Sequence, residues 1–230
     1  MARGDSDDGE GVPVGRDIIG DTPDIWGAHY STESDTVQRD YDTFADSGAY
    51  DETFDEWGYV GPETAAAIMK NYVSTDGRIL DAACGSGLTG TAMHNLGYTR
   101  IDGIDISPRL LKIAEGTGAY DGLRRVDMQQ FPFPFADGEY DAVMFIGALT
   151  YFETNDVLRE LCRIVRSGGS IVFSQRDDLM RDRSYGEELQ GLVREGLWRR
   201  TFGTEPMPYL PHHPEYGTAI KVQYFVYEVL

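Results

Sequence analysis

Cysteine is scarce in this sequence. The two cysteines, Cys84 and Cys162, are far apart and form no C-x-x-C pair, which excludes a disulfide framework and a cysteine-based zinc site, and we expect no metal site. Long apolar runs are also lacking, because the longest, from Ala142 to Leu149, is far shorter than the roughly 18 to 20 residues that cross a membrane. The start of the chain lacks the basic-then-apolar order of a secretory signal. We therefore expect a cytoplasmic protein that binds no membrane.

Basic side chains are few as well. The chain has 20 lysines and arginines against 39 aspartates and glutamates, a formal net charge of −19. Residues 1–60 hold 16 of these acids and only 3 of the bases. A surface of this sign repels phosphate backbones, so we expect no nucleic-acid partner. Composition leaves the oligomeric state open between a monomer and a homodimer.

The chain divides into three parts. Residues 1–25 are rich in glycine and aspartate without apolar periodicity, which predicts a disordered acidic tail. Residues 26–75 are predicted to form an N-terminal helical lid segment, with a helix from Pro62 to Val73. Residues 76–230 are predicted to form the main domain, with a C-terminal insert at about 203–217 that faces the substrate. The lid segment is punctuated by aromatic residues: Trp26, Tyr30, Tyr41, Phe44, Tyr50, Phe54, Trp57 and Tyr59.

Strand and helix patterns alternate after residue 76. An α/β fold with a mostly parallel sheet follows from this alternation. Ser107-Pro108 predicts an N-cap with proline at the first helical position. Strands are expected at 78–82, 100–105, 122–126, 141–146 and 170–175, helices at 89–96, 109–115 and 156–165, and a long last strand at 219–229.

A glycine-rich turn between the first strand and its helix carries the main functional signal. Asp81 ends the strand, and Gly85 and Gly87 follow it, so the backbone can approach a ligand closely at a helix N-terminus. Asp105 ends the next strand, at the distance where a carboxylate accepts hydrogen bonds from ribose hydroxyls. Asp127 ends the third strand with Met128 beside it, placed for an adenine ring. Together the three strand ends indicate an adenosine-type cofactor.

A nicotinamide dinucleotide is the alternative. Leu88-Thr89-Gly90 formally completes G-x-G-x-x-G, so this pattern alone leaves an NAD-dependent oxidoreductase open. Asp81 argues against that interpretation, because an acid facing the loop repels a pyrophosphate but suits the cationic amino group of S-adenosylmethionine.

With these motifs, the sequence resembles the class I S-adenosylmethionine-dependent methyltransferases over roughly residues 41–175. Residues 80–87 are similar to their glycine motif, 103–108 to their ribose motif and 126–128 to their adenine motif. Residues 140–149 resemble their fourth strand and the loop after it. One departure is Ala83, where the family commonly has glycine.

The resemblance implies a methyltransferase with a Rossmann-like, doubly wound sheet of seven strands, the last one antiparallel. It also implies S-adenosylmethionine as cofactor, S-adenosylhomocysteine as product, and an N-terminal segment that folds over the cofactor. Tyr50 is the candidate for the methionine carboxylate. The cofactor residues implied in this sequence are Tyr50, Asp81, Ala83, Gly85, Ser86, Gly87, Asp105, Ile106, Asp127, Met128 and Ile146.

A narrower resemblance concerns the methyltransferase-like family named for the Williams–Beuren chromosomal region. It rests on Tyr50-Asp51, on residues 57–62 with the sequence WGYVGP, and on residues 147–149 with the sequence GAL. The substrate of that family is not carried over to this chain.

The acceptor is expected to be a small molecule with a nitrogen, sulfur or oxygen nucleophile, methylated by in-line displacement. Residues 146–152 lack the Asp/Asn-Pro-Pro-Tyr arrangement of enzymes that methylate DNA bases or protein glutamine. A catalytically silent cofactor-binding regulatory module is the competing interpretation. Candidate substrate residues are Trp57, Tyr59, Tyr151 and Arg176, and candidate catalytic residues are His212, His213 and Tyr59.

Two of these assignments have plain alternatives. Adjacent histidines in a proline-rich loop are more often simply exposed than catalytic. Arg176 is placed to bind a substrate carboxylate, and an ion pair with Asp177 or Asp178 is as good an interpretation.

Overall fold

The computed structural model describes residues 32–230 apart from 153–155, 183–184, 215 and 218. The expected tail at residues 1–25, together with Trp26 and Tyr30, lies outside the described residues.

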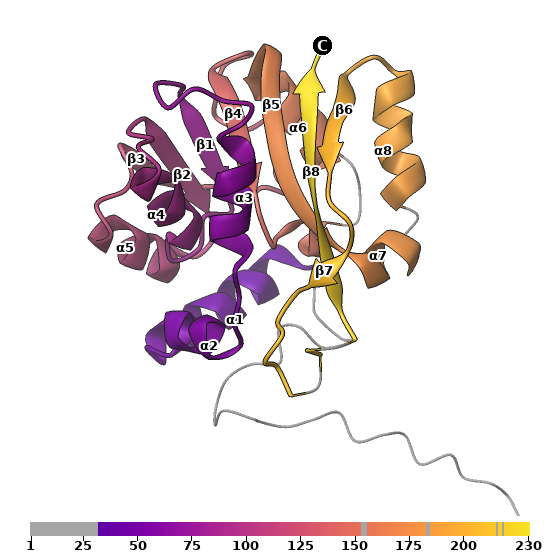
Figure 1. The fold of residues 1–230 in the computed structure, drawn as a ribbon. Helices are drawn as coiled ribbons and strands as arrows, with labels where there is room; N and C mark the ends of the chain where they lie inside the picture. The colour runs from indigo at the N-terminus through magenta and orange to yellow at the C-terminus, as the bar shows by residue number, and fades with distance from the viewer. Residues whose placement is uncertain (1–31, 153–155, 183–184, 215, 218) are drawn as a thin grey trace, which may run out of the picture.

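A single mixed sheet forms the centre of the molecule, in the order β3-β2-β1-β4-β5-β8-β6 (Figure 1). The parallel strands are β1 (Ile79–Ala82), β2 (Ile101–Asp105), β3 (Gly122–Arg125), β4 (Tyr140–Phe145) and β5 (Val165–Arg176). The last strand, β8 (Lys221–Val229), is antiparallel to β5 and to β6 (Trp198–Gly203). The predicted Rossmann-like sheet of seven strands with an antiparallel last strand is confirmed, and β7 (Met207–Pro208) adds a short pairing to β8.

Alternate side chains of the strands pack into two separate cores, one on each face of the sheet. Leu80, Val143 and Phe173 pack in one cluster, whereas Ile79, Met144 and Val172 pack in the other. Both faces are therefore buried, which explains why these strands are nearly continuous apolar runs in the sequence.

Helices cover both faces. The first core lies against α6 (Asp156–Ile164) and α8 (Tyr185–Arg194), and the second against α3 (Gly61–Met69) and α4 (Leu88–Asn95). The short helix α7 (Asp177–Asp182) follows β5, and η1 (Leu149–Tyr151) follows β4. Helix α5 (Pro108–Gly116) begins as predicted, because the Ser107 hydroxyl accepts a hydrogen bond from the Leu110 backbone N–H at 3.0 Å.

The sequence patterns missed part of the C-terminal half. Helix α6 ends at Ile164, and β5 runs through Gly168 and Gly169, although the sequence predicted a strand only from residue 170. Strand β6 was not predicted, because it packs one tryptophan inward and then exposes four residues in a row, so it lacks the alternation of a strand that is half buried.

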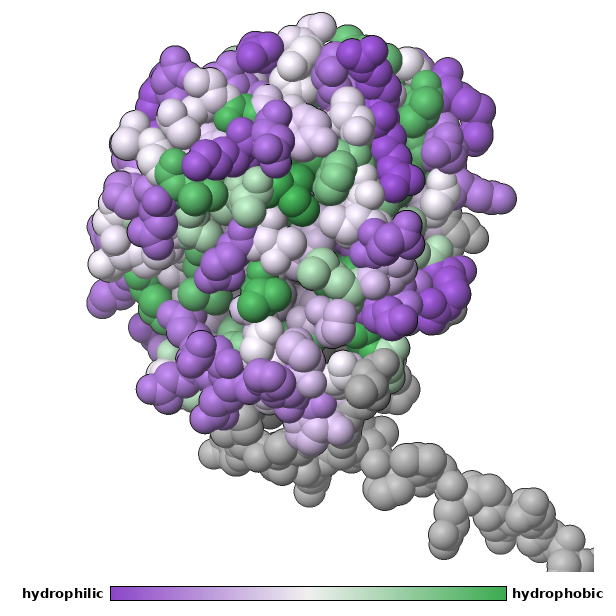
Figure 2. Space-filling view, viewed as in Figure 1, coloured by the Kyte–Doolittle hydropathy of each residue, from purple (hydrophilic) through white to green (hydrophobic). Residues whose placement is uncertain are grey.

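Two N-terminal helices close one end of the sheet. Helices α1 (Ser34–Asp46) and α2 (Tyr50–Glu56) lie below the sheet in Figure 1, at the end where β7 and the loop into β8 also lie. Phe44 and Phe54 anchor them in the second core. On the face shown in Figure 2, hydrophobic residues form small separate groups among hydrophilic ones. Among the described residues, no helix is both long and apolar enough to span a membrane.

Candidate functional site

A pocket lies where the carboxyl ends of β1, β2 and β4 meet α1 and α2. Its empty space is about 960 Å³ with its open mouth included. Open parallel sheets bind ligands at this edge, where the strand order reverses. Here the reversal falls between β1 and β4, which lie side by side although two strands separate them in the chain.

The turn after β1 forms one wall. Ala83 has φ 58°, a left-handed conformation that costs a non-glycine residue roughly 1 to 2 kcal/mol. The family that the sequence resembles commonly has glycine at this position. With alanine the turn is preserved at that cost. Gly85 is also left-handed, with φ 55°, and a Cβ there would lie 3.3 Å from the Tyr50 hydroxyl. Tyr50 therefore lies directly against the glycine loop.

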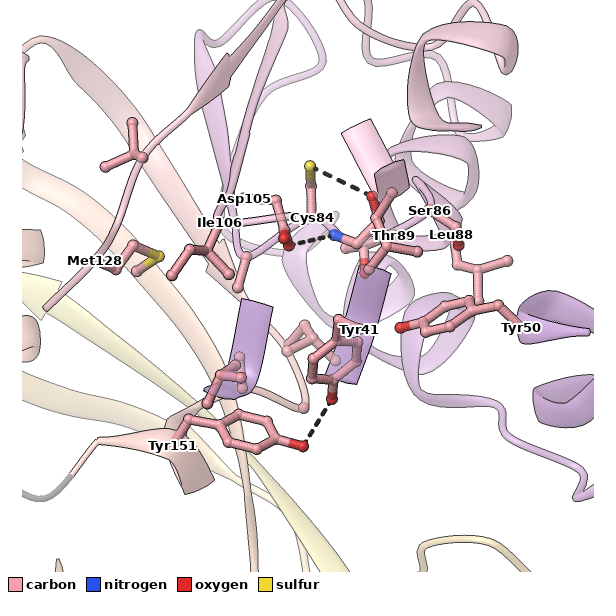
Figure 3. Close-up of a pocket in the computed structure, with 18 of the residues that line it drawn as sticks. Tyr41, Tyr50, Cys84, Ser86, Leu88, Thr89, Asp105, Ile106, Met128 and Tyr151 are labelled. Carbon is pink, nitrogen blue, oxygen red and sulfur yellow. Dashed lines mark hydrogen bonds between the residues drawn. The ribbon is translucent and has the colours of Figure 1, made fainter. Parts of the chain in front are cut away.

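Asp105 joins this turn to the end of β2. Its Oδ2 accepts a hydrogen bond from the Gly85 N–H at 2.9 Å, and its Oδ1 accepts one from the Ser107 N–H at 2.8 Å (Figure 3). Burial raises the pKa of the Asp105 carboxyl, and these backbone hydrogen bonds oppose the rise. Since a carboxylate oxygen accepts more than one hydrogen bond, both oxygens retain acceptor capacity for a ligand.

Asp127 and Met128 line the pocket at the end of the segment that follows β3. Asp127 Oδ1 accepts hydrogen bonds from the Ser34 hydroxyl and the Gln129 N–H, both at 3.0 Å. The Met128 side chain is buried and lies next to Ile106 in the close-up (Figure 3). This end of the pocket combines a carboxylate with flat apolar walls, as an adenine ring requires.

Asp81 does not line the pocket, although the sequence placed it there. Its carboxylate is buried and accepts a hydrogen bond of 2.7 Å from the Tyr120 hydroxyl. Burial raises the pKa of Asp81 to about 7. Asp81 lies on the same strand face as Ile79, which is the face covered by α3 and α4, because side chains two residues apart point the same way.

Tyr120 also explains two of the glycines. Its ring lies 3.2 Å from where a Cβ on Gly87 would be. From where a Cβ on Gly90 would be, the ring is only 2.2 Å away, a distance that only glycine permits. Its hydroxyl also accepts the Gly90 N–H at 3.2 Å. Neither glycine lines the pocket, so the second and third glycines of G-x-G-x-x-G serve packing under the loop.

Five tyrosines line the pocket, and one of them, Tyr50, lies against the Gly85 turn. The hydroxyls of Tyr41 and Tyr151 are 2.7 Å apart and share a hydrogen bond, which Figure 3 shows with Tyr50 beside it. Tyr59 and Tyr209 meet edge to face, with ring centroids 5.6 Å apart. Burial raises the pKa of Tyr41, Tyr50, Tyr59 and Tyr209, so these phenols stay neutral at physiological pH.

Nine of the predicted cofactor residues come together in this pocket, and Asp81 and Gly87 are the exceptions. Of the substrate candidates, Tyr59 and Tyr151 also line it. The nine are Tyr50, Ala83, Gly85, Ser86, Asp105, Ile106, Asp127, Met128 and Ile146.

The structure places the other candidates outside the pocket lining. Trp57 packs edge to face on His213, with ring centroids 4.4 Å apart, and His213 Nδ1 accepts a hydrogen bond from the Tyr216 N–H. His212 is exposed. Arg176 forms a two-pronged ion pair with Asp178, at 2.6 and 3.1 Å, as one of its two interpretations expected.

Several lining residues were missed. Ser34, Val37 and Gln129 close the adenine end, and Tyr209 and Gly147 contribute to the tyrosine end. The sequence indicated the two segments that hold Gly147 and Tyr209. No local pattern predicted that these residues would lie together. The α1 residues give no signal of their own, because an amphipathic helix shows which face is buried without showing against what.

Three hydrogen bonds tie the N-terminal helices to the three motif turns. The Ser86 hydroxyl donates to Asp51 at 2.6 Å, the Ser107 hydroxyl to Asp42 at 2.6 Å, and the Ser34 hydroxyl to Asp127 at 3.0 Å. Each helix is therefore hydrogen-bonded directly to a turn that borders the pocket. Among the described residues, no group of three or more potential ligands could hold a metal ion.

The described residues fit S-adenosylmethionine in order along the pocket. Asp127 and Met128 suit the adenine, and the free lone pairs of Asp105 suit the ribose hydroxyls. The Gly85 turn and the Tyr50 hydroxyl suit the methionine end. A neutral phenol is a hydrogen-bond donor for a carboxylate, so Tyr50 stays the candidate for the methionine carboxylate.

Comparisons with known proteins agree with this geometry. A model described as "Methyltransferase domain" matches residues 80–173. Human Methyltransferase-like protein 27 is 31% identical over 124 residues, which cover 52% of this chain and 50% of that protein. The chain spans about half or less of the length of the curated relatives it matches.

Solved structures share the fold. The [4+2]-cyclase SpnF has a TM-score of 0.65 at 16% identity, over 86% of this chain and 97% of its own. A SAM-dependent methyltransferase from Methanosarcina mazei has a TM-score of 0.57 at 17% identity, over 71% of this chain and 97% of its own. The region that matches the methyltransferase domain, residues 80–173, runs from β1 into β5, and the chain shares its fold with these solved structures.

Proposed function

We propose that the protein binds S-adenosylmethionine through Tyr50, Gly85, Asp105, Asp127 and Met128 and transfers its methyl group to a small-molecule acceptor. The observation that carries this proposal is one continuous pocket, with the motif carboxylates at one end and the tyrosines at the other. When bound, the cofactor supplies an electrophilic methyl group on a sulfonium. The protein's part is to hold an acceptor in line with it and to exclude water.

The proposed acceptor end lies at the loop after β4. Ile146 and Gly147 lead from the cofactor residues to Tyr59 and Tyr209, and Tyr151 lies in the same loop. Tyr59 acts there as a hydrogen-bonding and packing group. It is not a general base, because burial raises its pKa well above that of an ordinary tyrosine and a neutral phenol takes no proton.

Three sequence predictions stay open within this proposal. The match to human Methyltransferase-like protein 27 supports in part the kinship with the family named for the Williams–Beuren region. A cytoplasmic location and a monomer or homodimer remain predictions.

The proposed function is tested by binding and turnover together. Titration calorimetry is expected to show that S-adenosylmethionine and S-adenosylhomocysteine bind one to one while NAD gives no heat. Incubation with a panel of small amines, thiols, alcohols and carboxylates is expected to give a methylated product by mass spectrometry. Preference for NAD would overturn the cofactor assignment, and binding without turnover across the panel would favour the regulatory module.

Residues 32–59 are proposed to act as a lid. The hydrogen bonds of Asp42 and Asp51 to the motif turns connect α1 and α2 to the cofactor residues, and such segments commonly gate sites by closing over ligand. Saturating S-adenosylhomocysteine is expected to slow amide hydrogen exchange in α1 and α2 by at least about tenfold relative to α8, which lies away from the pocket. Equal protection of α1 and α2 with and without ligand would show that they are fixed.

A further inference from the structure

The hydroxyls of Tyr59 and Tyr209 converge on one point at the acceptor end of the pocket. The oxygen of Tyr59 lies 3.2 Å, and that of Tyr209 3.7 Å, from where a Cβ on Gly147 would be. Neither hydroxyl has a hydrogen-bond partner among the described residues, and Tyr209 is only 6% exposed. Two phenol oxygens are thus aimed at a space that glycine at position 147 leaves free.

The charged residues that line the pocket are all acidic. Among the described residues that line it, Asp105 and Asp127 are the only carboxylates, and there is no lysine, arginine or histidine. Arg176 lies outside the lining and is close enough to Tyr209 to oppose the rise in its pKa, but its guanidinium is paired with Asp178. The lining therefore provides no cationic partner for an anionic acceptor.

This distribution of charge discriminates between acceptor classes. A carboxylate or thiolate would place an unpaired anion in a pocket that already holds two, at a cost of several kcal/mol. An alcohol must lose a proton as it reacts, and the lining phenols are too weakly basic to take it. A neutral amine needs no base before attack, and the positive charge it acquires is favoured by tyrosine rings and by the acidic lining of the pocket.

We propose that the acceptor is an amine that reacts in its neutral form, with its nitrogen held by Tyr59 and Tyr209 above Gly147. This inference rests on the proposed methyl transfer. The nitrogen lone pair forms the new C–N bond while the C–S bond breaks, and the electron pair of that bond stays on sulfur. The positive charge passes from sulfur to nitrogen, and the extra proton of a primary or secondary amine then leaves to water.

The two phenols give the amine its direction. A primary amine has two N–H groups and one lone pair, and the oxygens of Tyr59 and Tyr209 each accept one N–H. The lone pair is then left to point away from them toward the methyl group. Holding the nucleophile in this way is the main contribution that a protein makes to an in-line displacement.

A matched panel tests the acceptor class. Primary amines, carboxylates and thiols that share a phenethyl group, such as phenethylamine, 3-phenylpropionate and 2-phenylethanethiol, are titrated into the S-adenosylhomocysteine complex. The same compounds are assayed for methylation with S-adenosylmethionine as the donor. We expect amines to bind at least about tenfold tighter than the matched acids, and kcat/KM to rise with pH up to the pKa of the free amine. Preference for the acids or thiols, or no binding of any amine, would overturn this proposal, whereas failure of S-adenosylhomocysteine to bind would overturn the proposed function itself.

Tyrosine-to-phenylalanine variants test the site. Tyr59→Phe and Tyr209→Phe keep the rings and remove the hydroxyls, so each is expected to raise the amine Kd about threefold to tenfold while the S-adenosylhomocysteine Kd stays the same. Tyr72→Phe, at an exposed tyrosine outside the pocket lining, is the matched control and is expected to change neither. Unchanged amine binding in both pocket variants would place the acceptor elsewhere.

Discussion

Replacing Asp105 by alanine is expected to weaken binding of S-adenosylhomocysteine by about 1.5 to 3 kcal/mol, as measured by calorimetry. The variant removes the proposed partner of the ribose hydroxyls. It also leaves the N–H groups of Gly85 and Ser107 without the carboxylate to which they donate, so the turn after β1 loses its tie to β2. Asp105→Asn keeps one acceptor oxygen. Its affinity for S-adenosylhomocysteine is expected to lie between those of the native protein and Asp105→Ala.

The same strand offers a matched control. Asp102 also lies on β2, but its carboxylate binds Arg78 at 2.8 Å and does not line the pocket. Asp102→Ala is expected to leave the S-adenosylhomocysteine Kd unchanged in the folded protein. Equal losses in the Asp102 and Asp105 variants would mean that binding tracks the stability of β2 and not a contact with the ligand.

Replacing Asp81 by asparagine is expected to change how stability depends on pH. Burial raises the pKa of Asp81 to about 7, against about 3.9 in an unfolded chain. The stability that this carboxyl contributes is therefore complete below the unfolded pKa, falls as the pH rises, and is lost once the pH passes the folded pKa. At about 1.4 kcal/mol per unit, the loss between pH 5 and pH 8 is about 3 kcal/mol.

Asparagine does not titrate and can still accept the Tyr120 hydrogen bond. Urea unfolding across this pH range is expected to show Asp81→Asn gaining on the native protein as the pH rises. Asp141→Asn is the control, because the hydrogen bond from Arg166 lowers the pKa of Asp141. That carboxylate is ionised in both the folded and the unfolded protein across this pH range, so the variant is expected to differ from the native protein by a constant amount. Parallel curves for Asp81→Asn and the native protein would show that Asp81 is not held neutral by burial.

The cofactor end of the pocket was largely predictable. Asp105 ends β2 and Asp127 comes soon after β3, and parallel strands bring their carboxyl ends to one edge. The register of β1 on β2, with Ala82 opposite Ile104, places the Gly85 turn beside Asp105. Motif spacing was enough to find these residues, because each one is fixed by the strand that precedes it.

For Asp81 and the two histidines, local sequence patterns did not predict where the side chains lie. The sequence identified Asp81 as an acid at a strand end, but its direction depends on which face of β1 it occupies and on Tyr120, 39 residues away. His213 is held between Trp57 and Tyr216, and only the packing of the insert against α2 decides that. A polar residue type near a site does not reveal whether a partner from another segment has already bound it.

The sequence by itself determined the α/β fold, its mostly parallel sheet and the edge at which the motif residues gather, because these follow from strand periodicity and from turns a few residues long. Only the tertiary structure decided which side chains share the pocket. Tyr41, Tyr59, Tyr151 and Tyr209 come from four separate segments, and they meet because α1, α2 and the C-terminal insert fold over the same end of the sheet. Such a meeting depends on contacts between distant segments, and no local pattern encodes it.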